Sequence, residues 1–315
     1  MSIFDKIFSQ PVLQNKPPVL IDVGASEKIN QKWKRIAKYS ICIAFDGDER
    51  DFEFTEKSKS EFKKLYTFHS LVSDKTSSKT KFYLTKSPYC SSVLIPNTDE
   101  LKNWSFNSKF KIEKEIFLKS TTINSSLKKL NLNYIDWFKT DSQGLDLRIF
   151  KSISEKIKRE IIIVEFEPGL IHAYLGEDKF EDILTEMQKT NFWISSSTLM
   201  GDVRITEEEL NLISKNKYVK KIISSSLKQN PGWIEIAFSN DFTKINSERK
   251  FLLGWVFAII EENYGFALKL SQLGCERFEN KIFKEMRAFT IHKLRFGFLN
   301  KYFFNTVKTK ISKLF

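Results

Sequence analysis

The segment Val19–Ser26, V-L-I-D-V-G-A-S, constrains the fold of this chain more than any other stretch. A run of apolar residues ends in an acid and a Gly-Ala-Ser turn, which is typical of a buried parallel strand whose carboxyl end enters a loop beside a ligand. Gly24 would let the backbone turn sharply and approach a small molecule closely, because it has no side chain. Asp22 would point into the same crevice.

A second apolar strand, Ile41–Phe45, ends in Asp46-Gly47-Asp48 about 20 residues later, the distance at which nucleoside-binding folds place a carboxylate for ribose hydroxyls. The loop after Gly24 reads A-S-E-K and lacks the G-x-G-x-x-G pattern that seats a pyrophosphate at a helix N-terminus. The pattern therefore favours S-adenosylmethionine, a nucleoside without phosphate, over NAD. An ordinary buried strand and turn without a ligand is the alternative.

Strands and helices alternate along most of the chain. The apolar spacing predicts a crossover helix over Glu27–Tyr39, opened by Ser26, and the pattern then repeats as far as a last strand at Gly232–Phe238. We therefore predict a doubly wound, mostly parallel α/β sheet that binds its ligand at the carboxyl ends of the strands. The polar segment Ser73–Lys81 is predicted as a surface loop. Asp74, at its start, lies where such folds usually contact adenine.

Two later segments carry the acids with the most chemical interest. The first, I-D-W-F-K-T-D-S-Q-G-L-D at Ile135–Asp146, is predicted as a strand that ends at Asp141. The second, I-I-I-V-E-F-E-P-G, contains Glu165 and Glu167, which alternation along a strand would turn to the same side. Carboxylates buried together are costly unless a positive or protic group meets them. We interpret them as functional, and neutralisation by lysines is the alternative.

Composition and charge narrow the class of protein. The chain has 315 residues, of which 41% are hydrophobic, so it can bury a core. Its net charge is +12, and the last 35 residues hold nine Lys or Arg against the single Glu285. Three widely spaced cysteines, Cys42, Cys90 and Cys275, indicate reduced thiols in a cytoplasmic protein. We expect neither a signal peptide nor a transmembrane segment.

Taken in order, several landmarks resemble the FkbM-type methyltransferases. They are V-L-I-D-V-G-A-S, A-F-D-G-D, Y-L-T-K-S-P-Y-C-S-S-V-L-I-P-N, I-D-W-F-K-T-D-S-Q-G-L-D and V-E-F-E-P. The resemblance implies a class I, Rossmann-like fold that uses S-adenosylmethionine to methylate a hydroxyl, commonly on a sugar or a polyketide-like product. The landmarks cover roughly Val19 to Asn240, and from about Ser247 onward only helical periodicity remains. We therefore divide the chain into a lead-in (1–18), a methyltransferase domain (19–246) and a basic helical C-terminal extension (247–315).

The resemblance also implies roles for single residues. Asp46 would bind the ribose, and Asp141 and Glu165 would form the transfer site. The methionine side of the cofactor would be lined by Asp22, Gly24, Ala25 and Ser26. One departure matters, because the family usually shows Asp-x-Glu-Gly-x-Glu where this chain has Asp141, Gln143, Gly144 and Asp146. Gln143 can hydrogen-bond but cannot act as a base.

The chemistry needs a base that removes a proton from the acceptor hydroxyl and a pocket that aligns the acceptor with the methyl group. The candidate bases are Asp141, Glu165, Glu167 and His172, although a solvated loop histidine is the simpler interpretation of the last. Glu167 and Gln143 are predicted to contact the acceptor. The carboxylates of Asp141, Glu165 and Glu167 could instead hold Mg²⁺.

Three rival hypotheses concern the partner. A nucleic acid substrate is disfavoured, because the fourth strand ends in T-D-S-Q-G rather than in the Asp/Asn-Pro-Pro-aromatic turn of base methyltransferases, and no basic stripe with interleaved aromatics crosses the α/β part. The basic C-terminal helix could lie on the inner face of an anionic membrane, or pack against the catalytic domain or a partner subunit in an oligomer. A non-catalytic binding protein on this scaffold is the third hypothesis, suggested by Gln143.

Overall fold

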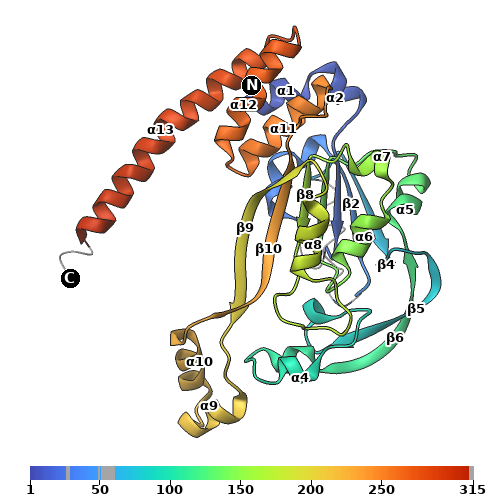
Figure 1. The fold of residues 1–315 in the computed structure, drawn as a ribbon, viewed down its shortest axis with the longest axis vertical. Coiled ribbons are helices and arrows are strands. Elements are labelled where there is room, and N and C mark those ends of the chain that lie inside the picture. Colours follow the sequence, from blue (N-terminus) through green and yellow to red (C-terminus); the bar gives the residue numbers. More distant parts are fainter. Residues whose placement is uncertain (26–28, 49, 51–60, 312–315) are drawn as a thin grey trace. The chain divides into compact units, whose positions relative to one another are not determined.

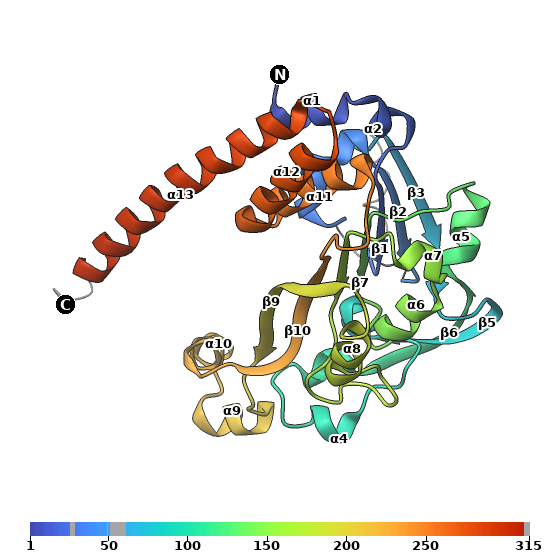
Figure 2. The same cartoon turned by 45° about the horizontal axis from the view of Figure 1, so that its top comes forward.

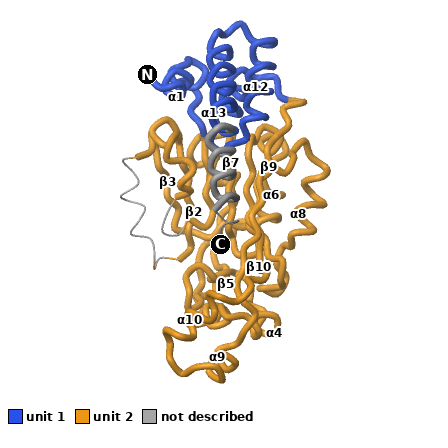
Figure 3. Tube along the Cα trace, turned by 90° about the vertical axis from the view of Figure 1, so that its left-hand side faces the viewer, with its two compact units in different colours: residues 1–18, 245–315 blue, residues 19–244 orange. Residues whose placement is uncertain are grey.

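The computed structural model describes the backbone of residues 1–25, 29–48, 50 and 61–311, and side chains as far as residue 297. The chain divides into two compact units (Figure 3). The larger unit contains residues 19–244. The smaller unit combines residues 1–18 with residues 245–315, so the N-terminal segment belongs with the C-terminal helices.

Seven strands of the described residues form the central sheet of the larger unit, in the order β3-β2-β1-β7-β8-β10-β9 (Figure 1). Their bounds are β1 (Val19–Val23), β2 (Ile41–Asp46), β3 (Lys64–His69), β7 (Trp137–Thr140), β8 (Ile163–Phe166), β9 (Phe192–Asp202) and β10 (Asn230–Asn240). The strands from β3 to β8 pair in parallel, whereas β10 is antiparallel to both β8 and β9. The fold is therefore α/β with a mostly parallel sheet, as predicted.

Alternation along β1 separates a core face from a polar face. Val19, Ile21 and Val23 belong to a buried cluster that includes residues of the helices on one side of the sheet, whereas Asp22 points to the opposite side. These helices are α5 (Ile123–Lys129), α6 (Asp146–Ser152), α7 (Glu155–Lys158) and α8 (Phe180–Met187). Figures 1 and 2 show α6 and α8 lying over one face of the sheet.

The connection from β1 to β2 differs from the predicted helix over Glu27–Tyr39. Its described part forms two short 3₁₀ helices, η1 (Gln31–Arg35) and η2 (Ala37–Tyr39). Trp33 and Ile36 are both fully buried, and a spacing of three residues brings two side chains to the same side of a 3₁₀ turn. The Trp33 ring also packs edge-on against Trp137, with 5.9 Å between ring centroids. Burial of these residues thus favours the tighter helix.

A three-stranded sheet lies beside the central one. Its order is β4-β6-β5, with β4 (Leu71–Val72), β5 (Ser77–Thr85) and β6 (Ile112–Thr121). β5 begins inside the segment predicted as a surface loop, because Thr80 Oγ1 donates to Ser120 Oγ over 3.1 Å and the two strands pair antiparallel. The connections nearby contain η5 (Pro88–Cys90), α4 (Thr98–Leu101) and η6 (Asn107–Phe110).

The last two strands form a long antiparallel hairpin. The segment between them holds two helices, α9 (Glu207–Ile213) and α10 (Lys217–Ser226), which extend beyond the strand ends in Figure 1. Gly201 and Asp202 are the last residues of β9.

The smaller unit is helical. It contains α1 (Ile3–Phe8), α2 (Pro11–Asn15), α11 (Glu248–Ile260), α12 (Tyr264–Arg277) and α13 (Ile282–Ile311). Trp255 lies at its core, where the indole packs edge-on against Phe4 and donates to Thr290 Oγ1 over 2.9 Å. Lys6 and Glu285 form an ion pair of 2.6 Å that ties α1 to α13. Over the described residues, no helix is both long enough and apolar enough to span a bilayer.

Candidate active site

The carboxyl ends of β1, β2 and β7 meet at one edge of the sheet, where the strand order reverses. Gly24 follows β1, Asp46 ends β2 and Asp141 follows β7. The backbone N–H of Gly24 donates to Phe45 O, and that of Asp141 donates to Val23 O, each over 3.0 Å. Three strand ends are therefore held together by main-chain hydrogen bonds before any side chain contributes.

Gly24 is required at this junction for two reasons. Its φ of +78° lies in the left-handed region that residues with a side chain rarely adopt. A Cβ at this position would also lie 2.1 Å from the carbonyl oxygen of Asp141. The space beside Gly24 is thus filled by the backbone of the neighbouring strand end, and the glycine sets the position of Asp141.

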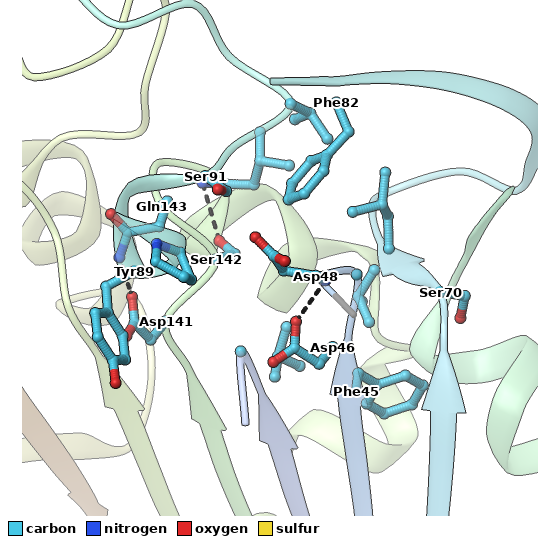
Figure 4. A pocket seen from close by; sticks show the side chains of 18 residues that line it. Phe45, Asp46, Asp48, Ser70, Phe82, Tyr89, Ser91, Asp141, Ser142 and Gln143 are labelled. Atoms are coloured by element: carbon cyan, nitrogen blue, oxygen red, sulfur yellow. Dashed lines mark hydrogen bonds between the residues drawn. The ribbon is translucent and has the colours of Figure 1, made fainter. Parts of the chain in front are cut away.

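A cavity of about 80 Å³ opens at these strand ends (Figure 4). Its apolar wall includes Phe45, Leu71, Val72, Phe82 and Val93, and its polar lining includes the carboxylates Asp46, Asp48 and Asp141. No lysine or arginine lines it among the residues that the structure describes. Carboxylates in a cavity attract a positively charged ligand and repel a phosphate.

The loop after β2 is braced from outside the cavity. Asp46 Oδ1 accepts the backbone N–H of Asp48 over 2.8 Å, and the buried Asp48 carboxylate pairs with Arg50 over 2.6 Å. Burial alone would raise the pKa of Asp48, but the hydrogen bonds and the charge of Arg50 hold it below its ordinary value. Arg50 also donates to Thr85 O and to Ser91 Oγ, which joins this loop to the end of β5.

A second, larger cavity of about 350 Å³ adjoins the first. Aromatic residues form much of its wall, among them Phe106, Phe110, Tyr174 and Trp233. Its polar lining includes four carboxylates and one ammonium group, contributed by Asp141, Glu167, Glu177, Asp202 and Lys109. Such a lining combines flat apolar surfaces with hydrogen-bonding groups.

Three residues line both cavities: Tyr89, Asp141 and Gln143. The side-chain amide of Gln143 donates to Asp141 Oδ1, as Figure 4 shows, and its oxygen accepts the hydroxyl of Tyr174 over 2.9 Å. The Gln143 backbone has a φ of +55°, and its carbonyl accepts Ser92 Oγ–H over 2.8 Å. Asp141 and Gln143 are therefore held at the boundary where ligands in the two cavities would meet.

Asp146 holds the surrounding loop rather than lining either cavity. Its carboxylate accepts the hydroxyl of Thr140 over 3.0 Å, both the N–H and the hydroxyl of Ser142, and the N–H of Glu167 over 3.0 Å. Burial raises the pKa of Asp146, and these hydrogen bonds oppose the rise. The side chain thus connects the chain after β7 to the chain after β8.

Asp141, Glu167 and Glu177, which line the larger cavity, have raised pKa values. Burial raises the pKa of Asp141 to about 6 against the opposing charge of Lys139. Burial and then the charge of Asp141 raise the pKa of Glu167 to about 9. Burial raises the pKa of Glu177 to about 7. Of Asp141 and Glu167, Asp141 therefore loses its proton at the lower pH.

Residues 24–193, more than half of the chain, match the methyltransferase FkbM domain. The chain belongs to this family. No curated protein matches it. The family match includes the strand ends that carry Gly24, Asp46 and Asp141, so both the smaller cavity and the boundary residues lie within the methyltransferase domain.

In this methyltransferase, two of the predicted site residues, Asp22 and Glu165, lie on the face of the sheet that is opposite to α6 and α8. Asp22, Lys139 and Glu165 occupy paired positions on β1, β7 and β8. Lys139 Nζ lies 3.2 Å from Asp22 Oδ1, and the backbone N–H of Asn30 donates to Asp22 Oδ2 over 3.1 Å. Asp22 is fully buried and lines neither cavity. It fixes the loop after β1 instead of facing into the described cavities.

Glu165 is engaged by three other groups. Its carboxylate accepts Trp137 Nε1–H over 2.6 Å and the amide of Asn30, and it pairs with Lys32 over 3.4 Å. Burial would lower the pKa of Lys139, but the surrounding acids raise it, with Asp22 contributing most. For Glu165, the alternative that lysines neutralise these acids is therefore correct.

Glu165 lies within β8, whereas Glu167 lies beyond its last residue. β8 ends at Phe166, so Glu167 already belongs to the turn that leads into Gly169. Among the described residues, no group of three or more His, Cys, Asp or Glu side chains could hold a metal ion. The predicted Mg²⁺ ligands Asp141, Glu165 and Glu167 thus do not form one cluster there.

The remaining predicted residues lie outside the two cavities or outside the described residues. His172 is exposed, with its Nε2 atom 3.4 Å from Lys179 Nζ, although Ile171 and Ala173 beside it line the larger cavity. Asp74 is exposed and accepts the hydroxyl of Ser73. Ala25 donates its N–H to Phe45 O over 3.1 Å and lines neither cavity. Ser26 lies outside the described residues.

Sequence reasoning overlooked several residues of the site. Lys139 is a charged residue inside the apolar strand W-F-K-T, between segments rich in acids, and this signal could have found it. Tyr174 and Glu177 come from the segment between β8 and α8, which shows no pattern of its own. Trp233 reaches the larger cavity from β10, about 90 residues after Gln143, so only the folded chain reveals it.

Proposed function

We propose that this chain transfers the methyl group of S-adenosylmethionine to a hydroxyl of a sugar, glycan or secondary-metabolite acceptor. One observation carries the proposal. In a methyltransferase domain, a small acidic cavity at the strand ends adjoins a larger polar and aromatic cavity, and Asp141, Gln143 and Tyr89 line both. Such a boundary is where a methyl donor and an acceptor would face each other.

The strand order supports a class I, Rossmann-like arrangement. Parallel strands continue from β3 to β8, a reversal of order lies between β1 and β7, and a single antiparallel strand, β10, enters beside β8. Ligands in open α/β sheets bind at such a reversal. The smaller cavity lies there.

The residues of the smaller cavity fit S-adenosylmethionine. The ligand carries a positive sulfonium and an ammonium group and has no phosphate, in agreement with a lining that holds carboxylates and no described lysine or arginine. Asp46 would hold the ribose hydroxyls, and Leu71, Val72 and Phe82 would pack on the adenine. The bound cofactor supplies a methyl group that is already activated for transfer.

Asp141 is the residue that we assign as the base. Its carboxylate lines both cavities, and a pKa of about 6 leaves it ionised but more basic than an ordinary aspartate at neutral pH. The amide of Gln143 holds one of its oxygens. The other oxygen would accept the proton of the acceptor hydroxyl.

Carboxyl groups beside aromatic rings in the larger cavity support a hydroxyl-rich acceptor. Asp141, Glu167 and Glu177 line this cavity together with Phe106 and Trp233. Carboxyl groups form hydrogen bonds with hydroxyls, and aromatic rings pack on apolar surfaces. A sugar supplies hydroxyls for the carboxyl groups and apolar faces for the aromatic rings.

A binding measurement and a turnover measurement test the proposal. Calorimetry with S-adenosylhomocysteine should show binding to the wild type, and NAD should show none. Asp46→Asn should weaken that binding by about tenfold or more, the loss expected for hydrogen bonds to a charged group. Asp141→Asn should retain it while lowering turnover by about 10² to 10⁴ in a screen of nucleotide sugars and glycans with labelled cofactor.

The outcomes separate the parts of the proposal. Failure of the wild type to bind S-adenosylhomocysteine would contradict the assignment of S-adenosylmethionine as the methyl donor. Binding without transfer to any acceptor would favour a non-catalytic protein on the same scaffold, the hypothesis that Gln143 suggests. Full turnover in Asp141→Asn would assign the base to another residue.

A further inference from the structure

The segment between β9 and β10 exposes six large apolar side chains within residues 212–227. Leu212 is 88% exposed, Tyr218 80% and Ile222 67%. Three more exposed large apolar residues fall in the same short stretch: Ile213, Val219 and Leu227. No residue of α10 is buried. Scattered apolar residues are normal on a protein surface, but a contiguous group indicates a contact with something else.

Helix α10 divides into an apolar side and a cationic side. Tyr218 and Ile222 are four residues apart and lie on one face, joined by Val219 and Ile223. Lysines 217, 220 and 221 occupy the other face. Lys220 forms an ion pair with Glu207 and donates to Asn211 over 3.0 Å, which braces α10 against α9. The exposed apolar residues are therefore held on a defined element.

The charge on α10 and the residues beside it has one sign, whereas α9 begins with the exposed Glu207, Glu208 and Glu209, of which Glu207 pairs with Lys220. Residues 212–228 include five lysines and no acidic residue. Lys215, Lys217, Lys221 and Lys228 are exposed. The cores of protein interfaces are depleted in lysine, whereas helices that lie on bilayers combine an apolar face with lysines that contact anionic headgroups. The charge thus favours a lipid surface over a second protein.

We infer that α9 and α10 form a membrane-binding element that inserts Leu212, Ile213, Tyr218 and Ile222 among the lipids of an anionic bilayer. This element begins where the larger cavity ends, since Asp202 at the end of β9 and Trp233 near the start of β10 both line that cavity. Docking would bring the cavity to the headgroups, where lipid-carried molecules are present. The inference does not depend on the methyl-transfer reaction.

Vesicle flotation of the full chain tests the inference. The wild type should float with phosphatidylcholine vesicles that contain phosphatidylglycerol, and less with phosphatidylcholine alone. The double variant Leu212→Ser with Ile222→Ser should lose about tenfold or more in binding. Lys217→Gln and Lys221→Gln should each lose about fivefold on the anionic vesicles, and added salt should remove this difference. Thermal unfolding checks that each variant is folded.

A matched control and two rival outcomes make the test decisive. Phe117, in β6, is 54% exposed, and Phe117→Ser should float like the wild type. Equal flotation of the wild type and the Leu212/Ile222 variant, or none by either, would overturn the inference. If the double variant Lys301→Glu with Lys308→Glu lost vesicle binding and the Leu212/Ile222 variant kept it, membrane binding would be assigned to α13 instead. A dimer in sedimentation velocity that the Leu212/Ile222 variant abolishes would assign the surface to a second copy.

Discussion

Gln143 donates a hydrogen bond from its side-chain amide to the carboxylate of Asp141, at the boundary of the two cavities. The resemblance to the family leads one to expect a glutamate at this position. The amide helps to keep the pKa of Asp141 from rising further, because it stabilises the ionised carboxylate. The neutral side chain of Gln143 thus favours the ionised form of Asp141, the assigned base.

The first prediction concerns the pH dependence of methyl transfer. The value of kcat/KM should rise with pH through about 6, since Asp141 accepts a proton only after it has lost its own. Gln143→Glu should move this rise to higher pH by about one unit, because a second carboxylate repels the first. The exposed Gln188→Glu should leave it unchanged. An unshifted profile in Gln143→Glu would separate Asp141 from the proton transfer.

The second prediction compares two glycines with nearly the same backbone angle. Gly24 has a φ of +78° and Gly176 a φ of +75°, but a Cβ on Gly176 would meet nothing within 4 Å. Gly176→Ala should therefore cost about 1 to 2 kcal/mol of unfolding free energy, from backbone strain alone. Gly24→Ala should cost at least about 3 kcal/mol and weaken S-adenosylhomocysteine binding, because Asp141 must move. Similar losses in urea unfolding for both variants would contradict this account.

The third prediction concerns Lys139, which lies between Asp22 and Glu165 in the register of the sheet. Lys139→Met should destabilise the chain by about 3 to 5 kcal/mol, since it leaves the buried Asp22 carboxylate without the cation that lies 3.2 Å from it. Glu165→Gln should cost less and leave turnover within a few-fold, because Glu165 lines neither cavity. Urea unfolding and initial rates measure both effects. A large loss of turnover in Glu165→Gln with unchanged stability would restore Glu165 to the transfer site.

The residues that could be predicted from the sequence are those whose position follows from local pattern. Asp46 and Asp141 each end an apolar run, and parallel strands bring such ends to the same edge. Both line the smaller cavity. The mostly parallel sheet follows from the same alternation of strands and helices.

What could not be predicted depends on pairing between distant segments. The contact of Glu165 with Trp137 and Lys32 follows from the register of β7 against β8 and from a 3₁₀ turn, neither of which has a signature in the apolar spacing. The larger cavity combines the loop after β5, the turn after β8 and the start of β10. Its aromatic residues, such as Trp233, look like ordinary core residues in the sequence.

The last prediction is a pH dependence of stability that depends on Glu167. Its ordinary pKa is 4.5, and burial with the charge of Asp141 raises it to about 9 in the folded chain. The unfolded chain therefore binds fewer protons between these values, and the free energy of unfolding falls as pH rises. Asp141 has largely lost its proton above pH 7, and Glu177 titrates near pH 7, so Glu167 should account for most of the fall between about pH 7 and pH 9.

Glu167→Gln should remove most of this fall, because glutamine keeps a neutral donor and has no proton to lose. The wild type should lose on the order of 1 kcal/mol or more between these two pH values, given about 1.4 kcal/mol per unit as the limit for one group. Urea unfolding at each pH measures it, and the exposed Glu181→Gln should keep the wild-type slope. If Glu167→Gln kept that slope as well, Glu167 would be ionised in the folded chain at neutral pH, and its carboxylate would compete with Asp141 for the acceptor's proton.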